Sequence, residues 1–190
     1  MSDELTTERA IIQTVVGLTL LLAGLAVLGL LFPTEMLAGS RAFVDVSGPW
    51  GVAAGVCLSD ATGFPIPPDA YLAAGRLGGL PFWEVVAAGS AGSLLGGTIA
   101  YAGARYLSHT EWFERRQGAG VQRARRLFEA YGAYALALAA VSPLPYSLLA
   151  WASGGLGFPL RRFLLVSLLR IPRVAGYLFA IELGFVDRFI

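Results

Sequence analysis

The chain has 190 residues, of which 56% are hydrophobic and only 14% are charged. Soluble domains carry roughly 25% charged residues, so this composition excludes most soluble proteins and indicates an integral membrane protein. The formal net charge is only +1, and a single cysteine, Cys57, excludes an intramolecular disulfide. One cysteine and one histidine, His109, make a poor metal site, so we expect neither a metal nor another cofactor.

Three long apolar segments are predicted to be transmembrane helices: residues 11–32, 85–104 and 160–186. At about 1.5 Å per residue, each is long enough to cross a hydrocarbon core of roughly 30 Å. The first two contain no charged residue, and the second is rich in glycine and alanine, which favours close packing of neighbouring helices. The third is unusual because Arg170 and Arg173 lie in its middle.

Two further apolar segments, residues 46–80 and 133–157, are interrupted by prolines. The interrupting prolines are Pro65, Pro67 and Pro68 in the first segment and Pro143 and Pro145 in the second. Proline breaks the helical hydrogen-bond ladder, and a broken backbone at membrane depth must be surrounded by protein or water. We therefore predict two re-entrant helical hairpins, each of which enters and leaves the membrane on the same side.

The two broken segments belong to an internal repeat. A shift of 78 positions places Pro65, Pro67, Gly79 and Pro81 on Pro143, Pro145, Gly157 and Pro159 without a gap. Each copy is then a broken hairpin, a Gly-Pro turn and a long helix that crosses the membrane once, so the second copy must be inverted. Inverted repeats with broken helices at the midplane are typical of secondary transporters.

The predicted fold is an all-α membrane protein: an inverted repeat of re-entrant hairpin plus transmembrane helix, preceded by one N-terminal transmembrane helix. We divide the chain into an N-terminal helix and linker (1–45), repeat 1 (46–107), a cytoplasmic arginine-rich linker (108–132) and repeat 2 (133–190). The arginine-rich linker shows a loose amphipathic pattern. This pattern favours a helix on the inner, anionic leaflet over a nucleic-acid-binding segment.

The arginines predict the orientation in the cell membrane, because cytoplasmic loops carry an excess of basic residues. Six arginines, Arg105 at the end of repeat 1 and five in the linker, lie on one side, which places the linker and the N-terminus in the cytoplasm and the C-terminus outside. With re-entrant hairpins the arginines divide nine to three between the two sides, whereas spanning hairpins give eight to four at best. The distribution therefore favours re-entry.

Four ionisable residues lie where a membrane protein should avoid them: Asp60 and Asp69 beside the first proline break, and Arg170 and Arg173 in the last span. Each costs about 2.5–3.5 kcal/mol at a helix centre on insertion scales. The two arginines are three residues apart and share a helix face. The acids would neutralise them if the first hairpin meets the last helix.

The sequence leaves two interpretations of these charges open. In the first, the ion pairs only lock the two repeats together. In the second, the two arginines bind an anion together with Tyr146 and Ser142 of the second break, while Asp60 and Asp69 exchange a proton.

Residues 60–69 read Asp-Ala-Thr-Gly-Phe-Pro-Ile-Pro-Pro-Asp. This stretch resembles the signature of the DedA family, also called VTT or SNARE-associated Golgi proteins, which runs acid, two residues, Gly, any, Pro, any, Pro, Gly, Glu. The spacing agrees throughout, with aspartates in place of the glutamates and Pro68 in place of the last glycine. A glycine-rich helix that ends in Tyr101 and Arg105 also matches. The resemblance covers roughly residues 46–184.

The chain departs from the family pattern in two places. Members often carry an acid where this chain has Gly97, and they carry two arginines in the second hairpin, where this chain reads Ser142-Pro-Leu-Pro-Tyr146. This Pro-x-Pro-Tyr form resembles a divergent branch. The family's essential arginines cannot be carried over, and we infer that Arg170 and Arg173 supply this charge from another helix.

The resemblance implies two re-entrant hairpins that face each other and a lipid-related role, such as flipping or scrambling of phospholipid or polyprenyl phosphate. We therefore expect a transporter, flippase or scramblase for an anionic lipid or related anion, with proton coupling and homo-oligomerisation left open. The alternative is a membrane scaffold or assembly factor in which the charges are structural. Membrane lipids are the expected partners and nucleic acid is not. We expect no enzyme, because the sequence offers no Ser-His-Asp set or metal cluster.

Overall fold

In the computed structural model of the protein, residues 33–63, 66–108, 119–142 and 146–182 are described, and they form helices and turns without a β-strand. The prediction of an all-α protein is confirmed for this part of the chain. The helices are α2 (Pro33–Thr62), α3 (Pro68–Leu77), α4 (Phe82–Leu107), α6 (Ala119–Tyr131), α7 (Ala133–Val141), α8 (Tyr146–Gly155), α9 (Leu160–Ser167) and α10 (Arg170–Ile181).

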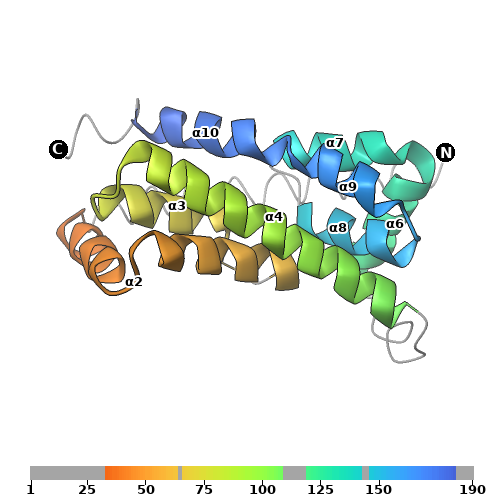
Figure 1. The fold of residues 1–190 in the computed structure, drawn as a ribbon, viewed down its shortest axis with the longest axis horizontal. Helices are drawn as coiled ribbons and strands as arrows, with labels where there is room; N and C mark the ends of the chain where they lie inside the picture. Colours follow the sequence, from red (N-terminus) through yellow and green to blue (C-terminus); the bar gives the residue numbers. More distant parts are fainter. Residues whose placement is uncertain (1–32, 64–65, 109–118, 143–145, 183–190) are drawn as a thin grey trace.

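The helices form an elongated bundle (Figure 1). α4 runs along its whole length through the middle of the view, and α9 and α10 together run beside it along the upper edge in the reverse direction. The second part of α2 and α3 lie in one half of the bundle, while α6, α7 and α8 lie in the other half. α2 and α8 both pack against α4, whereas α7 packs against α9.

α2 is bent at Gly48, which has φ 53° and ψ −150°, a backbone conformation that residues with a side chain rarely adopt. Pro49 follows directly. It has no N–H to donate and disfavours the helical conformation in the residue before it, so the hydrogen-bond ladder is interrupted here. The linker predicted before residue 46 is therefore helical from Pro33 onward, and the bend separates this part of α2 from the part that follows Gly48.

Three helical stretches are long and apolar enough to cross a membrane: Thr34–Thr62, Phe82–Leu107 and Leu160–Ile181. The last two confirm the apolar helices predicted at residues 85–104 and 160–186, within the described part of the chain. The first was not predicted as one span, and it contains the bend at Gly48. The span predicted at residues 11–32 lies outside the described residues.

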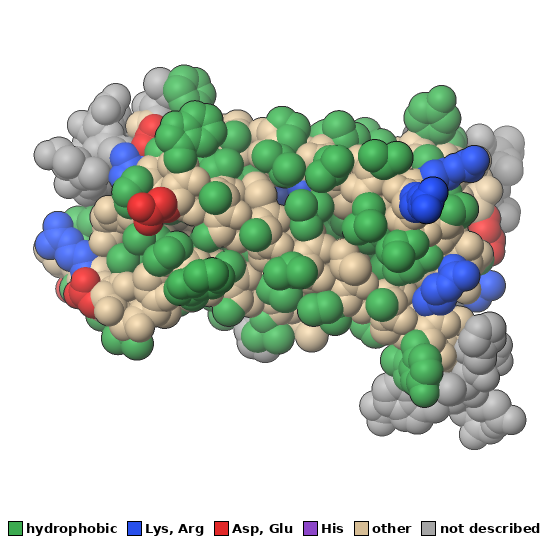
Figure 2. Space-filling view, in the orientation of Figure 1, with side chains coloured by type: hydrophobic (Ala, Val, Ile, Leu, Met, Phe, Trp, Pro, Cys, Tyr) green, Lys and Arg blue, Asp and Glu red, His purple; other side chains and the backbone are tan. Residues whose placement is uncertain are grey.

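The surface fits a lipid environment. Figure 2 shows hydrophobic side chains along the middle of one face of the bundle, with most charged side chains gathered at its two ends. On α4, the exposed aromatic residues Trp83 and Tyr106 lie near opposite ends of the helix. Their spacing along the helix is about 35 Å, close to the thickness of the hydrocarbon core, and aromatic residues favour both membrane interfaces.

The 78-residue shift found in the sequence also relates the helix boundaries. Shifted α3 coincides with α8, and the first residue of α4, Phe82, falls on the first residue of α9, Leu160. The turns before α4 and α9 both contain a glycine with positive φ, Gly79 at 99° and Gly157 at 71°. The order of short helix, turn and long helix is therefore the same in both copies, although the second long helix is divided after Ser167.

Small residues let neighbouring helices approach α4 closely, as the composition of this helix predicted. A Cβ added at Gly92 would overlap the backbone carbonyl of Ala53 on α2, and one added at Gly96 would overlap that of Cys57. The third such position is on α8, where Gly154 lies against the backbone of Tyr101. The prediction of close packing along α4 is therefore confirmed.

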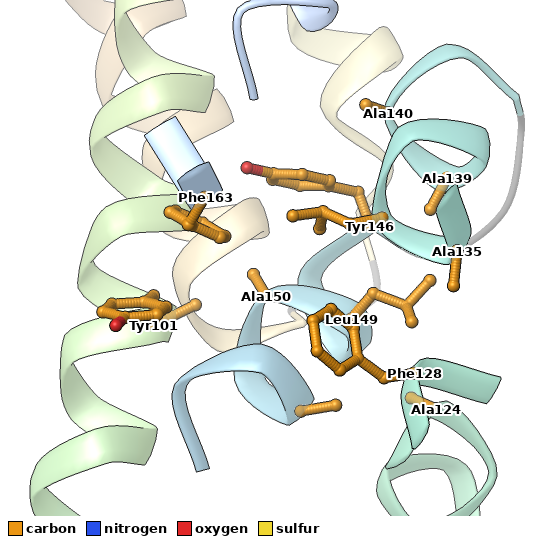
Figure 3. Close-up of a cluster of buried hydrophobic side chains, with 13 residues drawn as sticks. Tyr101, Ala124, Phe128, Ala135, Ala139, Ala140, Tyr146, Leu149, Ala150 and Phe163 are labelled. Atoms are coloured by element: carbon orange, nitrogen blue, oxygen red, sulfur yellow. The ribbon is translucent and has the colours of Figure 1, made fainter. Parts of the chain in front are cut away.

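Two apolar clusters fill the two halves of the bundle. The first, which we call the α2–α3 cluster, consists of buried Val52, Val56, Leu72, Leu80, Val85, Val86, Val174 and Leu178. The second, the α7–α8 cluster, includes buried Tyr101, Phe128, Leu136, Tyr146, Leu149, Phe163 and several alanines (Figure 3). In the second cluster the rings of Tyr101 and Phe163 are stacked with centroids 4.7 Å apart.

The amphipathic helix predicted in the arginine-rich linker is present as α6, but its buried side contacts protein. Ala124 and Phe128 are buried, and the Phe128 ring meets that of Phe158 edge to face, with centroids 5.1 Å apart. Arg125 and Arg126 point to the exposed side. These two residues lie on the side of α6 that packs against α8, while the location of this helix on the inner leaflet stays a prediction.

Candidate functional site

A polar cluster lies in the middle of the bundle, where the two halves meet. It is formed by Asp60 near the end of α2, Ser93 in α4, Tyr146 at the start of α8 and Arg170 at the start of α10. Asp60 is only 3% exposed and Arg170 only 2%. The site is therefore built from helix ends of both halves around the centre of α4.

Arg170 is placed by a break in the last long helix. α9 ends at Ser167 and α10 begins at Arg170, with two leucines in the turn between them. Pro172 cannot donate a backbone hydrogen bond to the residue four positions earlier, and its ring disfavours a continuous helix there. The N-terminal end of α10, with its partial positive charge, thus lies at the polar cluster.

Asp60 and Arg170 form what we call the inner pair. Arg170 Nη2 lies 2.6 Å from Asp60 Oδ2, and Ser93 Oγ donates to the same oxygen at 2.6 Å. Arg170 Nε in turn donates to Ser93 Oγ, so the three side chains close a hydrogen-bonded ring. A buried arginine–carboxylate pair is tolerated only when further hydrogen bonds satisfy it, and Ser93 supplies them.

Tyr146 supports the arginine from the second half of the bundle. The Arg170 guanidinium lies over the Tyr146 ring, 4.3 Å from its centroid, an arrangement that attracts the cation to the face of the ring. The Tyr146 hydroxyl is 2.6 Å from Ser167 Oγ. Ser167 donates its own hydrogen to the carbonyl of Phe163, so Tyr146 is the donor to Ser167.

Two further ion pairs join α3 to the end of the chain. In the middle pair, Arg173 Nη2 donates to Asp69 Oδ2 at 3.1 Å. In the end pair, Arg76 Nε donates to Glu182 Oε1 at 2.6 Å. Arg76 also donates to the carbonyl of Leu80 at 3.3 Å, which ties the end pair to the turn before α4.

The structure brings together five of the six residues predicted for substrate binding and proton coupling. Asp60, Asp69, Arg170 and Arg173 form the inner and middle pairs, and Tyr146 lies against Arg170. The sixth, Ser142, lies at the end of α7, where its backbone N–H donates to the carbonyl of Leu138.

The predicted hairpin breaks are placed only in part. Pro67 lies directly before α3, and Pro68 is its first residue. Both places accept proline because the first turn of a helix needs no backbone donor. Pro65, Pro143 and Pro145 lie outside the described residues.

Sequence reasoning missed Ser93 and Ser167. Both are fully buried, and each connects a charged or aromatic side chain of the site to its surroundings. A serine inside a helix rich in small residues suggests packing, so Ser93 offered no separate signal. Ser167 lies three residues before Arg170, and this helical spacing could have indicated it.

A hydrogen bond joins α8 to the end of α2 near the polar cluster. Trp151 Nε1 on α8 donates to the carbonyl of Ala61 at the end of α2, at 2.9 Å. The end of α2 is therefore tied both to α8 and, through Asp60, to α10.

No group of three or more histidine, cysteine or acidic side chains that could hold a metal is found among the described residues. The polar atoms of the cluster are those of arginine, aspartate, serine and tyrosine. Arginine binds phosphate and carboxylate through its planar fork, while aspartate can gain or lose a proton. The arrangement can therefore hold an anion and exchange a proton in the same buried place.

Comparison with known proteins agrees with the fold and the motif. The VTT domain family matches residues 66–183, which is more than half of the chain. The match begins within the proline motif and includes α3, α4, α6, α7, α8, α9 and α10. A search of curated proteins and a search of solved structures each gave no match. The family is membrane-associated and is commonly described as transporter-like or flippase-like. On this match and on the residues that resemble its signature, the chain belongs to the VTT domain family, the DedA or SNARE-associated Golgi family.

Proposed function

We propose that this protein moves an anionic lipid headgroup, or a related anion, across the cell membrane. The observation that carries the proposal is the inner pair, an arginine and an aspartate buried together at the centre of the bundle. Ionisable residues at such depth are costly to insert and mark substrate or ion pathways by default. Membership of the VTT domain family supports the same class of function.

The proposed architecture has two re-entrant hairpins, α2–α3 and α7–α8, related as an inverted repeat. α3 and α8 have 10 residues each. Ten helical residues span about 15 Å, which is only half of the hydrocarbon core. The opposite directions of α4 and of α9–α10 in Figure 1, and the 78-residue correspondence of their starting points, support the inversion.

The proposed orientation follows from the described arginines. One end of the bundle contains the end of α4, all of α6 and the start of α9 (Figure 1), and these carry Arg105, Arg125, Arg126, Arg161 and Arg162. The other end carries Arg41 and Arg76. The excess of basic residues supports a cytoplasmic location for the first end, with α10 running toward the outside.

The inner pair suggests how an anion and a proton would be coupled. An anion that binds Arg170 takes the guanidinium away from Asp60, which leaves a carboxylate buried without its counter-charge. Such an unpaired buried charge is strongly unfavourable, so Asp60 takes up a proton as the anion arrives. Each anion is then accompanied by one proton. Tyr146 holds the Arg170 guanidinium against its ring while this exchange takes place.

A reconstituted system tests the proposal. Purified protein is placed in liposomes that contain a fluorescent phosphatidylglycerol, and movement between leaflets is followed with and without a pH gradient. We expect the wild type to move the lipid and Arg170→Ala and Asp60→Asn to abolish movement. Arg125→Gln is the matched control, because this exposed arginine of α6 pairs only with Glu129 on the surface. A folded wild type that moves neither this lipid nor inorganic phosphate would contradict the proposal.

The scaffold alternative is favoured by one observation: three ion pairs and the Trp151–Ala61 hydrogen bond all join parts of the chain that are distant in sequence. A charge swap, Asp60→Arg with Arg170→Asp, distinguishes the two functions. If the charges only lock the bundle, a folded swap retains cellular function. If Arg170 binds the substrate, the swap places a carboxylate where the anion must bind and abolishes lipid movement.

A further inference from the structure

We propose that the headgroup reaches the inner pair from the end of the bundle where α3 ends, and that Arg76 and Arg173 are successive binding sites on this route. The inference rests on the proposed function and specifies its access side. It is based on the three ion pairs, which join α3 or the end of α2 to the last segment of the chain: Arg76–Glu182, Arg173–Asp69 and Arg170–Asp60.

The exposure of the three pairs rises steadily from the centre of the bundle to its end. The arginine and acid side chains of the inner pair are 3% and 5% exposed, and those of the middle pair 15% and 13%. Those of the end pair are 20% and 28% exposed. On α3, Asp69 and Arg76 are seven residues apart, which places them on one side of the helix at about 10 Å spacing. Charged groups therefore continue from the end of the bundle to the buried site.

The middle pair is bonded in a way that permits exchange. Asp69 Oδ1 is buried and has no hydrogen-bond partner among the described residues, and the pair is held by a single hydrogen bond. The inner pair, by contrast, is fixed by the ring of contacts with Ser93. A phosphate that displaces Asp69 from Arg173 therefore breaks one hydrogen bond between the two side chains, fewer than at the inner pair.

The other half of the bundle offers no comparable route. Between the polar cluster and the α6 end lie the stacked rings of Tyr101 and Phe163 and the other members of the α7–α8 cluster (Figure 3). No ion pair is found among the described residues of α7, α8 and α9. A charged headgroup would lose its hydration there without gaining a partner. The ion pairs therefore favour the α3 end as the side of entry.

Charge neutralisation tests the assigned binding sites. Arg76→Gln removes the outermost cation of the route, and we expect lipid movement to slow by about fivefold, as for the loss of one partly exposed charge at a binding surface. Arg125→Gln on the α6 surface is the control and should change the rate by less than about twofold. Equal rates for Arg76→Gln and wild type, with both proteins folded, would overturn the role of Arg76.

Cysteine labelling tests the access side independently of lipid movement. In a Cys57→Ala background, a membrane-impermeant thiol reagent is added to one side or the other of proteoliposomes. Trp83→Cys and Tyr134→Cys, exposed residues of α4 and α7 in different halves of the bundle, calibrate the two sides. The reporters are Tyr177→Cys, one turn beyond Arg173 on α10, and Leu149→Cys in the α7–α8 cluster.

We expect the cysteine at position 177 to react only from the side at which position 83 reacts, and the cysteine at 149 to react at least tenfold more slowly from either side. Reaction of 177 from the side of 134, or faster reaction at 149, would overturn the route. If lipid does not move but 177 is labelled as expected, the proposed function fails while the access side stands.

Discussion

The hydroxyl of Tyr146 fills the space of a missing side chain on α4: a Cβ added at Gly97 would lie 2.6 Å from that oxygen and 2.7 Å from the ring carbon Cε1. The same ring lies under the guanidinium of Arg170. The family resemblance implies an acid at this position in many members, and here Tyr146 at the start of α8 occupies the space beside residue 97. The absence of a side chain at residue 97 therefore leaves room for the ring against which Arg170 lies.

Gly97→Ala is expected to displace the Tyr146 ring and to lower the free energy of unfolding by about 1–3 kcal/mol, the usual cost of overpacking. In a Tyr146→Leu background the added methyl meets a shorter side chain, so the two changes together should cost less than the sum of each alone. Thermal unfolding in detergent measures both effects. Gly103→Ala, whose Cβ would meet only Trp151 at 3.8 Å, is the control. Strictly additive losses would contradict the contact.

Removal of one member of the inner pair is expected to cost more than removal of both. Arg170→Met alone leaves Asp60 as an unpaired buried charge and should destabilise the protein by about 3–5 kcal/mol. Arg170→Met combined with Asp60→Leu removes both charges and should recover most of that loss. Chemical unfolding in mixed micelles measures the cycle. A double variant as unstable as the worse single variant would show that the two residues do not compensate each other.

Gly48→Ala is expected to destabilise the bend in α2 by about 1–3 kcal/mol, because a side chain is strained at this φ and ψ. Gly39→Ala lies on the same helix, has ordinary helical backbone and meets nothing within 4 Å, so it should be neutral or stabilising by about 0.5–1 kcal/mol. The comparison of the two melting temperatures checks the bend. Equal effects of the two substitutions would mean that the bend is absent in the folded protein.

Trp151→Phe removes the indole N–H that joins α8 to the end of α2, while keeping an aromatic ring. We expect a loss of about 0.5–1.5 kcal/mol in unfolding free energy, since the Ala61 carbonyl loses this donor. If the two hairpins must separate during transport, lipid movement in liposomes should become faster in this variant. An unchanged melting temperature would contradict a stabilising bond.

The prolines of the two broken segments indicate where the short helices α3 and α8 begin. α3 begins at Pro68 and α8 directly after Pro145, because proline is disfavoured within a helix and accepted at its first turn. The repeat shift, read from prolines and glycines alone, also relates α3 to α8. These features could be predicted from the sequence because each follows from the backbone preferences of proline and glycine.

The sequence predicts that buried acids and arginines form ion pairs, but it does not predict the partners in each pair. Charge balance indicated that two acids would meet two arginines, but which acid meets which arginine depends on the rotation of α10 about its axis, which tertiary packing sets. The end pair joins residues 106 positions apart, a separation at which no local pattern indicates a contact. The helix before Gly48 was missed because its sequence mixes polar and apolar residues without a clear period.

The two copies of the repeat share their helix boundaries but not their charges. In the inner and middle pairs, both acids belong to repeat 1 and both arginines to repeat 2. Each repeat synthesised alone would carry like charges at membrane depth with no partner to neutralise them. A second copy of either repeat could therefore not supply the opposite charges that these two pairs need.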